Sequence, residues 1–274
     1  MREVTHIVIP DSQVKPGVPT KYLDWIGRYI VDHFAGRPDV KIIHLSDFAD
    51  MASLSSYDKG KKAMEGRRYV ADIEAANAAW KLLNRALEEY NAHKRQQKHT
   101  QWWPERYITL GNHEDRITRA TELDPQLEGV ISLDDLDFGD WTVITFLEPL
   151  NLDGVIYSHY FYNPMTGRPY GGTAITRLKQ LGHSFTMGHQ QTYDIAVRFV
   201  GNQQQRGLIC GACYLHDEEY RGPQGNWHFR GIFVCHEVED GAYNLMEVSL
   251  DYLCRRYEGV SLSTWLKRHG LGTP

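Results

Sequence analysis

Five short polar segments, each at the end of a predicted strand, carry side chains that bind divalent metal ions. They are Asp11-Ser12-Gln13, Ser46-Asp47-Phe48-Ala49-Asp50, Gly111-Asn112-His113-Glu114, Ser158-His159 and Gly188-His189-Gln190-Gln191. The first four follow apolar runs, and polar loops at the carboxyl ends of strands are where open α/β sheets build their sites. Carboxylate, amide and imidazole groups gathered there predict two bound ions and metal-assisted attack on a phosphate ester.

The spacing within the segments indicates how two ions are shared. Asp11 and Gln13 are two residues apart, so their side chains point the same way and can bind one ion. Asp47 is the candidate bridging carboxylate, which gives one oxygen to each of two ions roughly 3.5 to 4 Å apart. The remaining candidate ligands are the amide of Asn112, the imidazoles of His159 and His189, and Gln191, which would complete the ion of Asp11 and Gln13.

His113 follows a candidate ligand in the chain but is expected to point the other way. It is therefore the candidate general acid that protonates a leaving oxygen, with Glu114 or Asp115 to orient its ring. The predicted catalytic residues are His113, Asp47 and Glu114. Three further candidates, expected to fix a loop or a histidine or to contact substrate, are Asp50, Arg116 and His216.

The elements that position these segments follow from the hydrophobic pattern. Apolar side chains recur at three- and four-residue spacing over residues 21–34 and 69–98, which predicts two helices between the first three strands. A shorter helix begins at Glu114. Strands predominate from Leu136 onward, with a helix over residues 172–181. The later strands are predicted over residues 141–146, 154–160, 185–187, 193–200, 207–213, 229–237 and 242–249. This pattern predicts an α/β protein with two packed sheets flanked by helices.

In this order the five segments resemble the motifs of the calcineurin-like metallophosphoesterases. That family carries Asp-x-His, Gly-Asp-x-x-Asp, Gly-Asn-His-Glu/Asp, a lone His and Gly-His-x-His. Here Ser46 replaces the first Gly of the second motif, the third motif is intact, and His159 and Gly188-His189 fit the last two. The resemblance spans residues 7–191 and implies a four-layer α/β/β/α sandwich of two mixed sheets. We expect one domain over residues 1–274.

Two departures from the family pattern bear on the metal. Gln13 and Gln191 stand where the family has two histidines that bind one of the ions. Because amide oxygens are harder ligands than imidazole, we expect a weaker site that prefers manganese, with magnesium, nickel, iron and zinc as the alternatives. The contexts around residues 10–16, 47–50 and 53–59 resemble phosphoesterases of tailed phages and prophages.

Composition limits the alternatives. A formal net charge of −5 argues against a globally basic nucleic-acid coat, although residues 59–68 could guide a polyanion or be a solvated loop. No apolar run reaches the ~20 residues of a membrane helix, and no signal-peptide pattern opens the chain. We therefore expect no membrane partner and a cytoplasmic location, that of the host cell if the protein is phage-encoded. The cysteines at 210, 213, 235 and 254 are expected to be buried rather than to bind zinc.

The sequence thus predicts a metallophosphoesterase, a hydrolase that uses two divalent ions. A phosphodiesterase is favoured, in particular a nuclease with DNA or RNA as its substrate. One alternative is a phosphomonoesterase acting on a nucleotide or a phosphoprotein. The other is a non-catalytic relative with a degenerate metal site that only binds phosphate or nucleic acid. The sequence does not indicate an oligomeric state.

Overall fold

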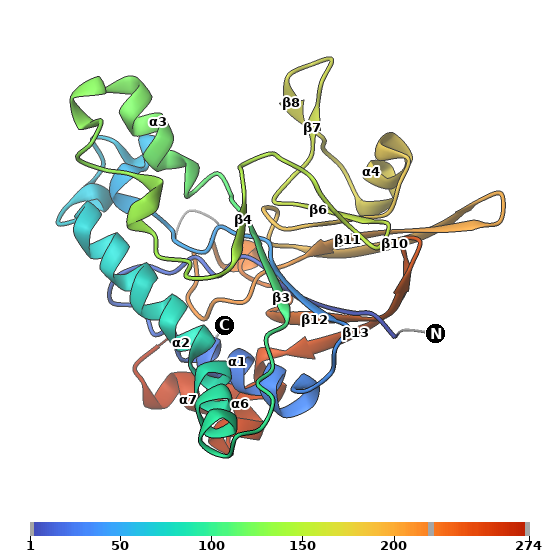
Figure 1. Cartoon of the computed structure of the whole chain (residues 1–274). Helices are drawn as coiled ribbons and strands as arrows, with labels where there is room; N and C mark the ends of the chain where they lie inside the picture. The colour runs from blue at the N-terminus through green and yellow to red at the C-terminus, as the bar shows by residue number, and fades with distance from the viewer. Residues whose placement is uncertain (1–2, 219–221, 272–274) are drawn as a thin grey trace.

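Two mixed β-sheets lie at the centre of the computed structural model, which describes residues 3–218 and 222–271 (Figure 1). The larger sheet has the order β13-β12-β1-β2-β3-β4. Its strands are β1 Thr5–Ile9, β2 Val40–His44, β3 Glu105–Thr109, β4 Thr142–Ile144, β12 Gly231–Glu239 and β13 Ala242–Ser249. Strands β1 to β4 run parallel, whereas β12 is antiparallel to both of its neighbours.

The smaller sheet has the order β10-β11-β9-β6-β5. Its strands are β5 Leu150–Leu152, β6 Val155–Ser158, β9 Phe185–Met187, β10 Tyr193–Val200 and β11 Gln203–Cys210. The central strand β9 is parallel to β6 and β11, while β5 and β10 pair in antiparallel fashion at the two edges. A separate small hairpin, β7 Tyr162–Asn163 and β8 Arg168–Pro169, follows β6.

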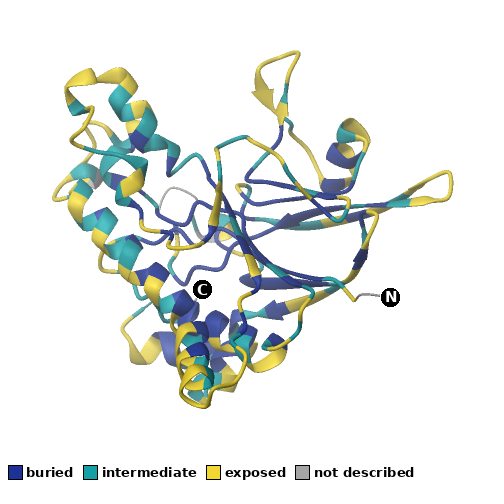
Figure 2. Ribbon diagram, in the orientation of Figure 1, coloured by how far each residue is buried: buried dark blue, intermediate teal, exposed yellow. Residues whose placement is uncertain are grey.

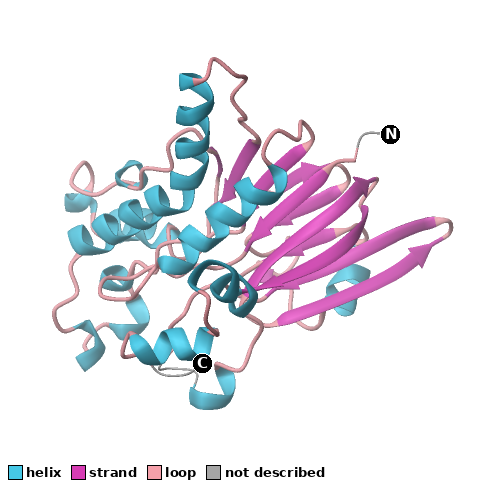
Figure 3. Ribbon diagram, turned by 90° about the horizontal axis from the view of Figure 1, so that it is seen from below, coloured by secondary structure: helices cyan, strands magenta, loops and turns pink. Residues whose placement is uncertain are grey.

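The helices lie mainly against the larger sheet, as Figure 3 shows. They are α1 Lys21–Phe34, α2 Tyr69–Gln96, α3 Asp115–Leu123, α4 Ala174–Leu181, α5 Gly222–Gly225, α6 Leu250–Glu258 and α7 Leu262–Arg268. Short 3-10 turns cover Ala52–Leu54, Ser56–Asp58, Lys62–Met64, Pro125–Leu127 and Leu133–Asp135. Within the described ranges, no helix combines the length and the apolar character needed to cross a membrane.

Alternate residues of β1 face two different cores. Ile7 and Ile9 belong to the apolar cluster that α1, α2, α6 and α7 form with the larger sheet. Val8 belongs to the cluster between the two sheets, and a third cluster joins α4 to the smaller sheet. Ile7, Val8 and Ile9 are all fully buried. Figure 2 shows that the central strands of the molecule are largely dark blue, the colour of buried residues. Because both faces of this sheet are covered, Ile7, Val8 and Ile9 of β1 are all apolar, and apolar and polar residues do not alternate there.

The predicted α/β class with two mixed sheets is confirmed. The helix over residues 21–34 and the strands over residues 185–187, 193–200 and 242–249 have the predicted bounds. Helix α2 ends at Gln96, two residues before the predicted end. The sequence interpretation missed α6 and α7, whose buried residues complete the core beneath the larger sheet.

Candidate metal centre

The loops that carry the candidate ligands meet where five strands end. The ligands follow closely on those ends: Asp11 after β1, Asp47 after β2, Asn112 after β3, His159 after β6 and His189 after β9. Backbone hydrogen bonds join neighbouring loops, because the N–H of Gln13 donates to the carbonyl of Asp47 (2.8 Å) and that of Gly188 donates to the carbonyl of His159 (3.1 Å). The site therefore lies where the two sheets bring their carboxyl ends together.

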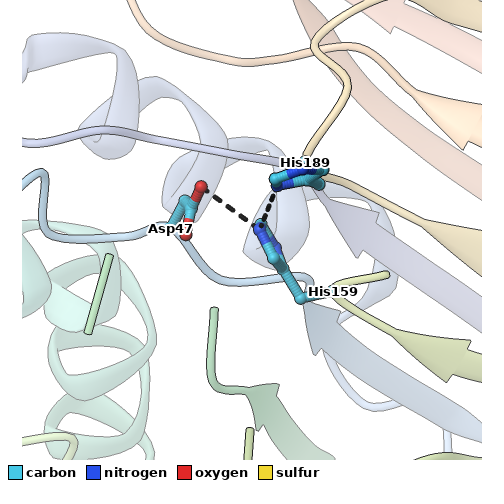
Figure 4. A group of neighbouring side chains, drawn as sticks. All are labelled: Asp47, His159 and His189. Atoms are coloured by element: carbon cyan, nitrogen blue, oxygen red, sulfur yellow. Dashed lines mark hydrogen bonds and ion pairs between the residues drawn. The ribbon is translucent and has the colours of Figure 1, made fainter. Parts of the chain in front are cut away.

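His159 is the centre of a compact cluster with Asp47 and His189 (Figure 4). Its Nε2 atom lies 3.2 Å from Oδ2 of Asp47, 3.1 Å from Oδ1 of Asn112 and 3.2 Å from Nδ1 of His189. On the other side of the ring, Nδ1 donates to the carbonyl of Leu45 (2.8 Å), since a carbonyl only accepts. This bond fixes the ring so that Nε2 faces the other ligands, as in histidines that bind metal.

Asp11 and Gln13, in the loop after β1 next to this cluster, carry two buried oxygens. Oδ1 of Asp11 accepts a hydrogen bond from the backbone N–H of His189 (3.1 Å). Among the described residues, Oδ2 of Asp11 and Oε1 of Gln13 have no hydrogen-bond partner. A buried oxygen without a partner costs free energy, and a bound cation would remove that cost. The residues present therefore fit a divalent ion at this position.

Two glycines allow the carboxylates to approach the loops. A Cβ atom at Gly188 would lie 2.2 Å from Oδ1 of Asp11, and one at Gly111 would lie 2.3 Å from Oδ1 of Asp47. Both distances are far inside van der Waals contact. Glycine is thus required at these positions of the third and fifth motifs, because any larger residue would collide with a carboxylate.

Several ligand loops have a backbone conformation that residues other than glycine rarely adopt. The φ angles are 41° at Gln13, 69° at Ser46, 39° at Asp47, 65° at His189 and 58° at Gln191. Each such conformation costs of the order of 1 kcal/mol and persists only where the surrounding structure imposes it. Five of the eleven non-glycine residues with such a conformation thus lie in the candidate ligand loops, and backbone strain of this kind is known at functional sites.

The charges at the centre favour a cation. Burial raises the pKa of Asp11 to about 7. Asp47 is buried too, but His113 and His159 outweigh burial and hold the pKa of its carboxyl well below the usual value. Burial would lower the pKa of His159, yet Asp47 and Asp11 raise it to about 9. The two carboxylates thus stabilise positive charge between them, which a protonated His159 or divalent ions can supply.

His113 lies beside this cluster. The carboxylate next to its ring is that of Asp50, which corrects the prediction that Glu114 or Asp115 orients the ring. Its Nδ1 atom is 3.0 Å from Oδ1 of Asp50, whereas neither Glu114 nor Asp115 contacts the ring. Nε2 of His113 is 3.7 Å from Oδ2 of Asp47 and 3.1 Å from a guanidinium nitrogen of Arg116. Asp50 therefore orients the ring, because the loop after β2 passes next to it.

Glu114 joins two ligand loops instead of acting on His113. Its carboxylate is fully buried and accepts hydrogen bonds from the hydroxyl of Ser46 (2.7 Å) and the backbone N–H groups of Ala49 (2.9 Å) and Gly111 (3.0 Å). Asp115 pairs with Arg119 on the surface of α3. In this structure Glu114 thus holds two loops together and does not orient His113, and its predicted catalytic role stays a prediction.

Arg116 holds the Asp50 loop. Its Nη1 atom donates to the carbonyls of Asp50 (2.8 Å) and Met51 (3.3 Å) and lies 3.7 Å from Oδ1 of Asp50. Burial opposes ionisation of Asp50, but His113, Lys15 and Arg116 outweigh it and lower its pKa to about 2. Asp50 is therefore ionised at neutral pH and can hold a protonated His113.

Gln191 and His216 are linked through Tyr214. The hydroxyl of Tyr214 donates to Oε1 of Gln191 (3.0 Å), and the ring of His216 stacks on Tyr214 with centroids 4.4 Å apart. His216 also contacts Glu218 through Nε2 at 2.7 Å, and Lys15 reaches the same carboxylate at 3.3 Å. His216 therefore supports the site from behind Gln191 rather than joining the cluster around Asp47.

Three residues near the site were not predicted from the sequence. The ring of Tyr160 packs against that of His189, with centroids 4.7 Å apart, and its place directly after His159 is a signal that could have been used. Arg177 on α4 is buried and donates to Tyr170 and Gln190. Nothing in the sequence indicates Arg177. The loop that begins at Tyr214 follows a predicted strand and so could line the site, but the contact of Tyr214 with Gln191 depends on distant elements.

The remaining alternatives have simple structural explanations. Arg67 and Lys61 in the predicted lysine-rich loop both pair with Asp58, so part of its charge is neutralised. All four cysteines are buried, and none belongs to the cluster of potential metal ligands found among the described residues.

A search of protein-family models and of curated proteins found no match to this sequence. The functional interpretation therefore depends on the site itself.

Proposed function

We propose that this protein is a metal-dependent phosphoesterase. The observation that carries the proposal is the pair of buried, unpartnered oxygens on Asp11 and Gln13 beside the cluster of Asp47, His159 and His189. These groups come from separate strand ends. These polar groups do not stabilise the core by packing, because each buried polar oxygen without a hydrogen-bond partner lowers the stability of the fold.

The ligands divide into two sets around Asp47. Asp11, Gln13 and Gln191 would hold one ion, and Asn112, His159 and His189 would hold the other. With amide oxygens in both sets, the centre suits manganese or magnesium better than zinc. Divalent ions there supply Lewis acidity toward a phosphate oxygen and acidify water at neutral pH.

The chain itself supplies proton transfer and positioning. His113 lies next to Asp47, and although burial opposes its charge, Asp47 and Asp50 raise its pKa. In this structure Nε2 of His113 accepts from Arg116, which can only donate. For His113 to give an Nε2 proton to the leaving oxygen of an ester, Arg116 has to release Nε2 so that it can be protonated. Asp50 and Arg116 hold the ring and its loop in place.

The favoured substrate is a phosphate diester, in particular DNA or RNA in a phage-related setting. The resemblance of the motifs to those of calcineurin-like metallophosphoesterases, with their four-layer sandwich of two sheets, supports a phosphoesterase. The choice of a diester is supported by the resemblance of residues 10–16, 47–50 and 53–59 to phosphoesterases of tailed phages and by the basic residues between 59 and 68. Arg119, half exposed on α3 and bonded to the carbonyl of Asn112 (3.0 Å), adds a cation next to the centre for a neighbouring phosphate. A phosphomonoesterase and a non-catalytic binding protein are the alternatives.

The test uses metal-stripped protein with manganese, magnesium, nickel, iron or zinc added back in turn. Hydrolysis of bis-p-nitrophenyl phosphate and p-nitrophenyl phosphate is measured for the wild type, for Asp47→Asn and for a matched control, Asp134→Asn, in an exposed turn. Metal-dependent cleavage of the diester that only Asp47→Asn abolishes supports the proposal. Preference for the monoester supports the phosphatase. Metal binding without cleavage of either ester, or of DNA and RNA, supports the binding protein.

A further inference from the structure

The hairpin of β10 and β11 extends beyond the other strands of the molecule (Figure 3). Its register is regular from the pair Tyr193–Cys210 to the pair Val200–Gln203. Strand β10 lies at the edge of the smaller sheet, so one side of its backbone has no neighbouring strand. An eight-residue edge of this kind, without lysine or proline, is open to pairing with another strand.

One face of β10 carries exposed apolar side chains. Ile195, Val197 and Phe199 alternate along the strand, so they share a face, and their exposed fractions are 38%, 44% and 67%. Tyr193 on the same face packs against Phe233 in the core between the sheets. The apolar stripe of Ile195, Val197 and Phe199 therefore continues the face of β10 that packs in the core, but the larger sheet does not cover it.

The hydrogen-bond pattern shows which backbone groups face the open edge. The N–H of Gly211 donates to the carbonyl of Thr192 (3.0 Å), just outside the first registered pair of the hairpin. Because bonded pairs alternate in an antiparallel ladder, the even-numbered residues of β10 bond to β11. The N–H and C=O groups of Ile195, Val197 and Phe199 thus point outward, at the same residues whose side chains form the apolar stripe.

We propose that this edge pairs with β10 of a second copy of the chain, in antiparallel fashion about a two-fold axis at Val197. In this register Ile195 lies opposite Phe199 of the second copy, and Val197 lies opposite its own counterpart. Three bonded pairs exchange about six backbone hydrogen bonds, since each pair exchanges two. The two smaller sheets become one continuous sheet across the dimer.

The sequence of β10 is complementary to itself in this arrangement. Apolar residues of the stripe meet only apolar residues, and on the opposite face Arg198 meets Ala196, so no like charges are directly opposed. A symmetric dimer requires such self-complementarity, whereas a strand from a different protein does not. This argument selects a second copy as the partner.

Other sheet edges among the described strands lack these properties. β4 and β5 have three residues each, and β13 exposes Asn244 and Glu247 at its edge. Polar and charged residues of this kind protect an edge from association, whereas the charged residues of β10, Asp194 and Arg198, lie on the face opposite its apolar stripe. Val143 on β4 nevertheless has an exposed fraction of 46%, close to that of Val197, and so provides a matched control position.

The test is the mass of the purified full chain in solution, measured by light scattering and sedimentation over a concentration series. The wild type is expected to be a dimer, and Val197→Lys is expected to weaken it at least about tenfold, because two lysines would face each other across the axis. Val143→Lys should remain a dimer. Far-UV circular dichroism verifies that each variant is folded.

A second measurement reports the register. Since the native cysteines are buried, Val197→Cys introduces an accessible thiol at the axis, which a short bis-maleimide should link into a covalent dimer. Val143→Cys should stay unlinked. A wild type that is monomeric at every concentration overturns the proposal. So does a dimer that survives Val197→Lys and does not crosslink at position 197. Neither result depends on phosphoesterase activity.

Discussion

Gly188 lies directly against the carboxylate of Asp11. A Cβ atom at position 188 would be 2.2 Å from Oδ1, the oxygen that accepts the backbone N–H of His189 at 3.1 Å. The absence of a side chain thus lets one loop hold the Asp11 carboxylate while presenting His189 to the cluster. A single contact connects the first and fifth motifs, which are far apart in the chain.

Gly188→Ala should therefore displace Asp11 and weaken metal binding by about tenfold to a hundredfold, the usual effect of disturbing the groups that orient a ligand. Calorimetric titration with manganese measures the change. Gly171→Ala is the matched control, because a Cβ there meets no atom within 4 Å and the backbone is not left-handed. Equal affinity in the two variants would contradict the assignment of Asp11 as a ligand.

Asp50→Asn should lower kcat by about tenfold to a hundredfold and leave metal content unchanged, because Asp50 orients His113 without touching the cluster. Asp115→Asn, which removes the charge of the neighbouring carboxylate that faces Arg119, should have little effect on kcat. Metal analysis and steady-state kinetics separate the two roles. If Asp115→Asn were the damaging change, the orientation of His113 by Asp50 would be wrong.

Glu114→Gln should destabilise the fold by roughly 2 to 4 kcal/mol. The carboxylate accepts three hydrogen bonds, from one hydroxyl and two backbone N–H groups. The NH₂ group of a glutamine cannot accept a hydrogen bond, so at least one of these buried donors would lose its acceptor. Urea unfolding measures the loss, with Glu122→Gln, at an exposed position on α3, as the control. Normal stability combined with lost activity would instead restore a catalytic role.

Lowering the pH should destabilise the protein through His6, which is buried between the sheets and contacts Tyr157 and Asp153. Burial lowers its pKa from 6.5 to about 4. Between these values the unfolded chain binds a proton that the folded chain does not, so the free energy of unfolding falls as the pH falls, by roughly 3 kcal/mol in total. Above pH 6.5 the ring is neutral in both states, and its contribution is fully present.

Chemical denaturation at a series of pH values tests this expectation. His6→Gln keeps a donor for Asp153 and an acceptor for Tyr157 without titrating in this range. It should therefore remove most of the slope between pH 6.5 and 4. An unchanged slope would assign the acid sensitivity to other groups.

Gln13→His should shift the metal preference toward zinc. The amide oxygen of Gln13 is buried without a partner, and an imidazole nitrogen in its place is a softer ligand. Competition between manganese and zinc, followed by metal analysis, gives the ratio of affinities in the wild type and the variant. No change in this ratio would indicate that Gln13 does not contact an ion.

The sequence predicted which loops meet, because each predicted strand ends in polar residues and parallel strands bring such ends together; that these loops bind metal stays a prediction. It misassigned the partner of His113, because adjacency in the chain favoured Glu114 whereas the fold turns that side chain toward Ser46. The contact of Tyr214 with Gln191 joins residues 23 positions apart on different elements, which no local pattern encodes. The buried residues Leu250, Leu253 and Cys254 of α6 and Leu262, Trp265 and Leu266 of α7 do follow the three- and four-residue spacing of a helix, so both helices are encoded locally.

The left-handed backbone at Gln13, Ser46, Asp47, His189 and Gln191 bears on how this chain folds. Local preference and global structure agree along most natural sequences, and this agreement gives a smooth route to a single native state. At these residues they conflict, and five of the eleven non-glycine residues with left-handed backbone lie in these loops. The ligand loops should therefore be among the last parts to become ordered during folding and the first to exchange their amide hydrogens, while the sheets beneath them stay protected.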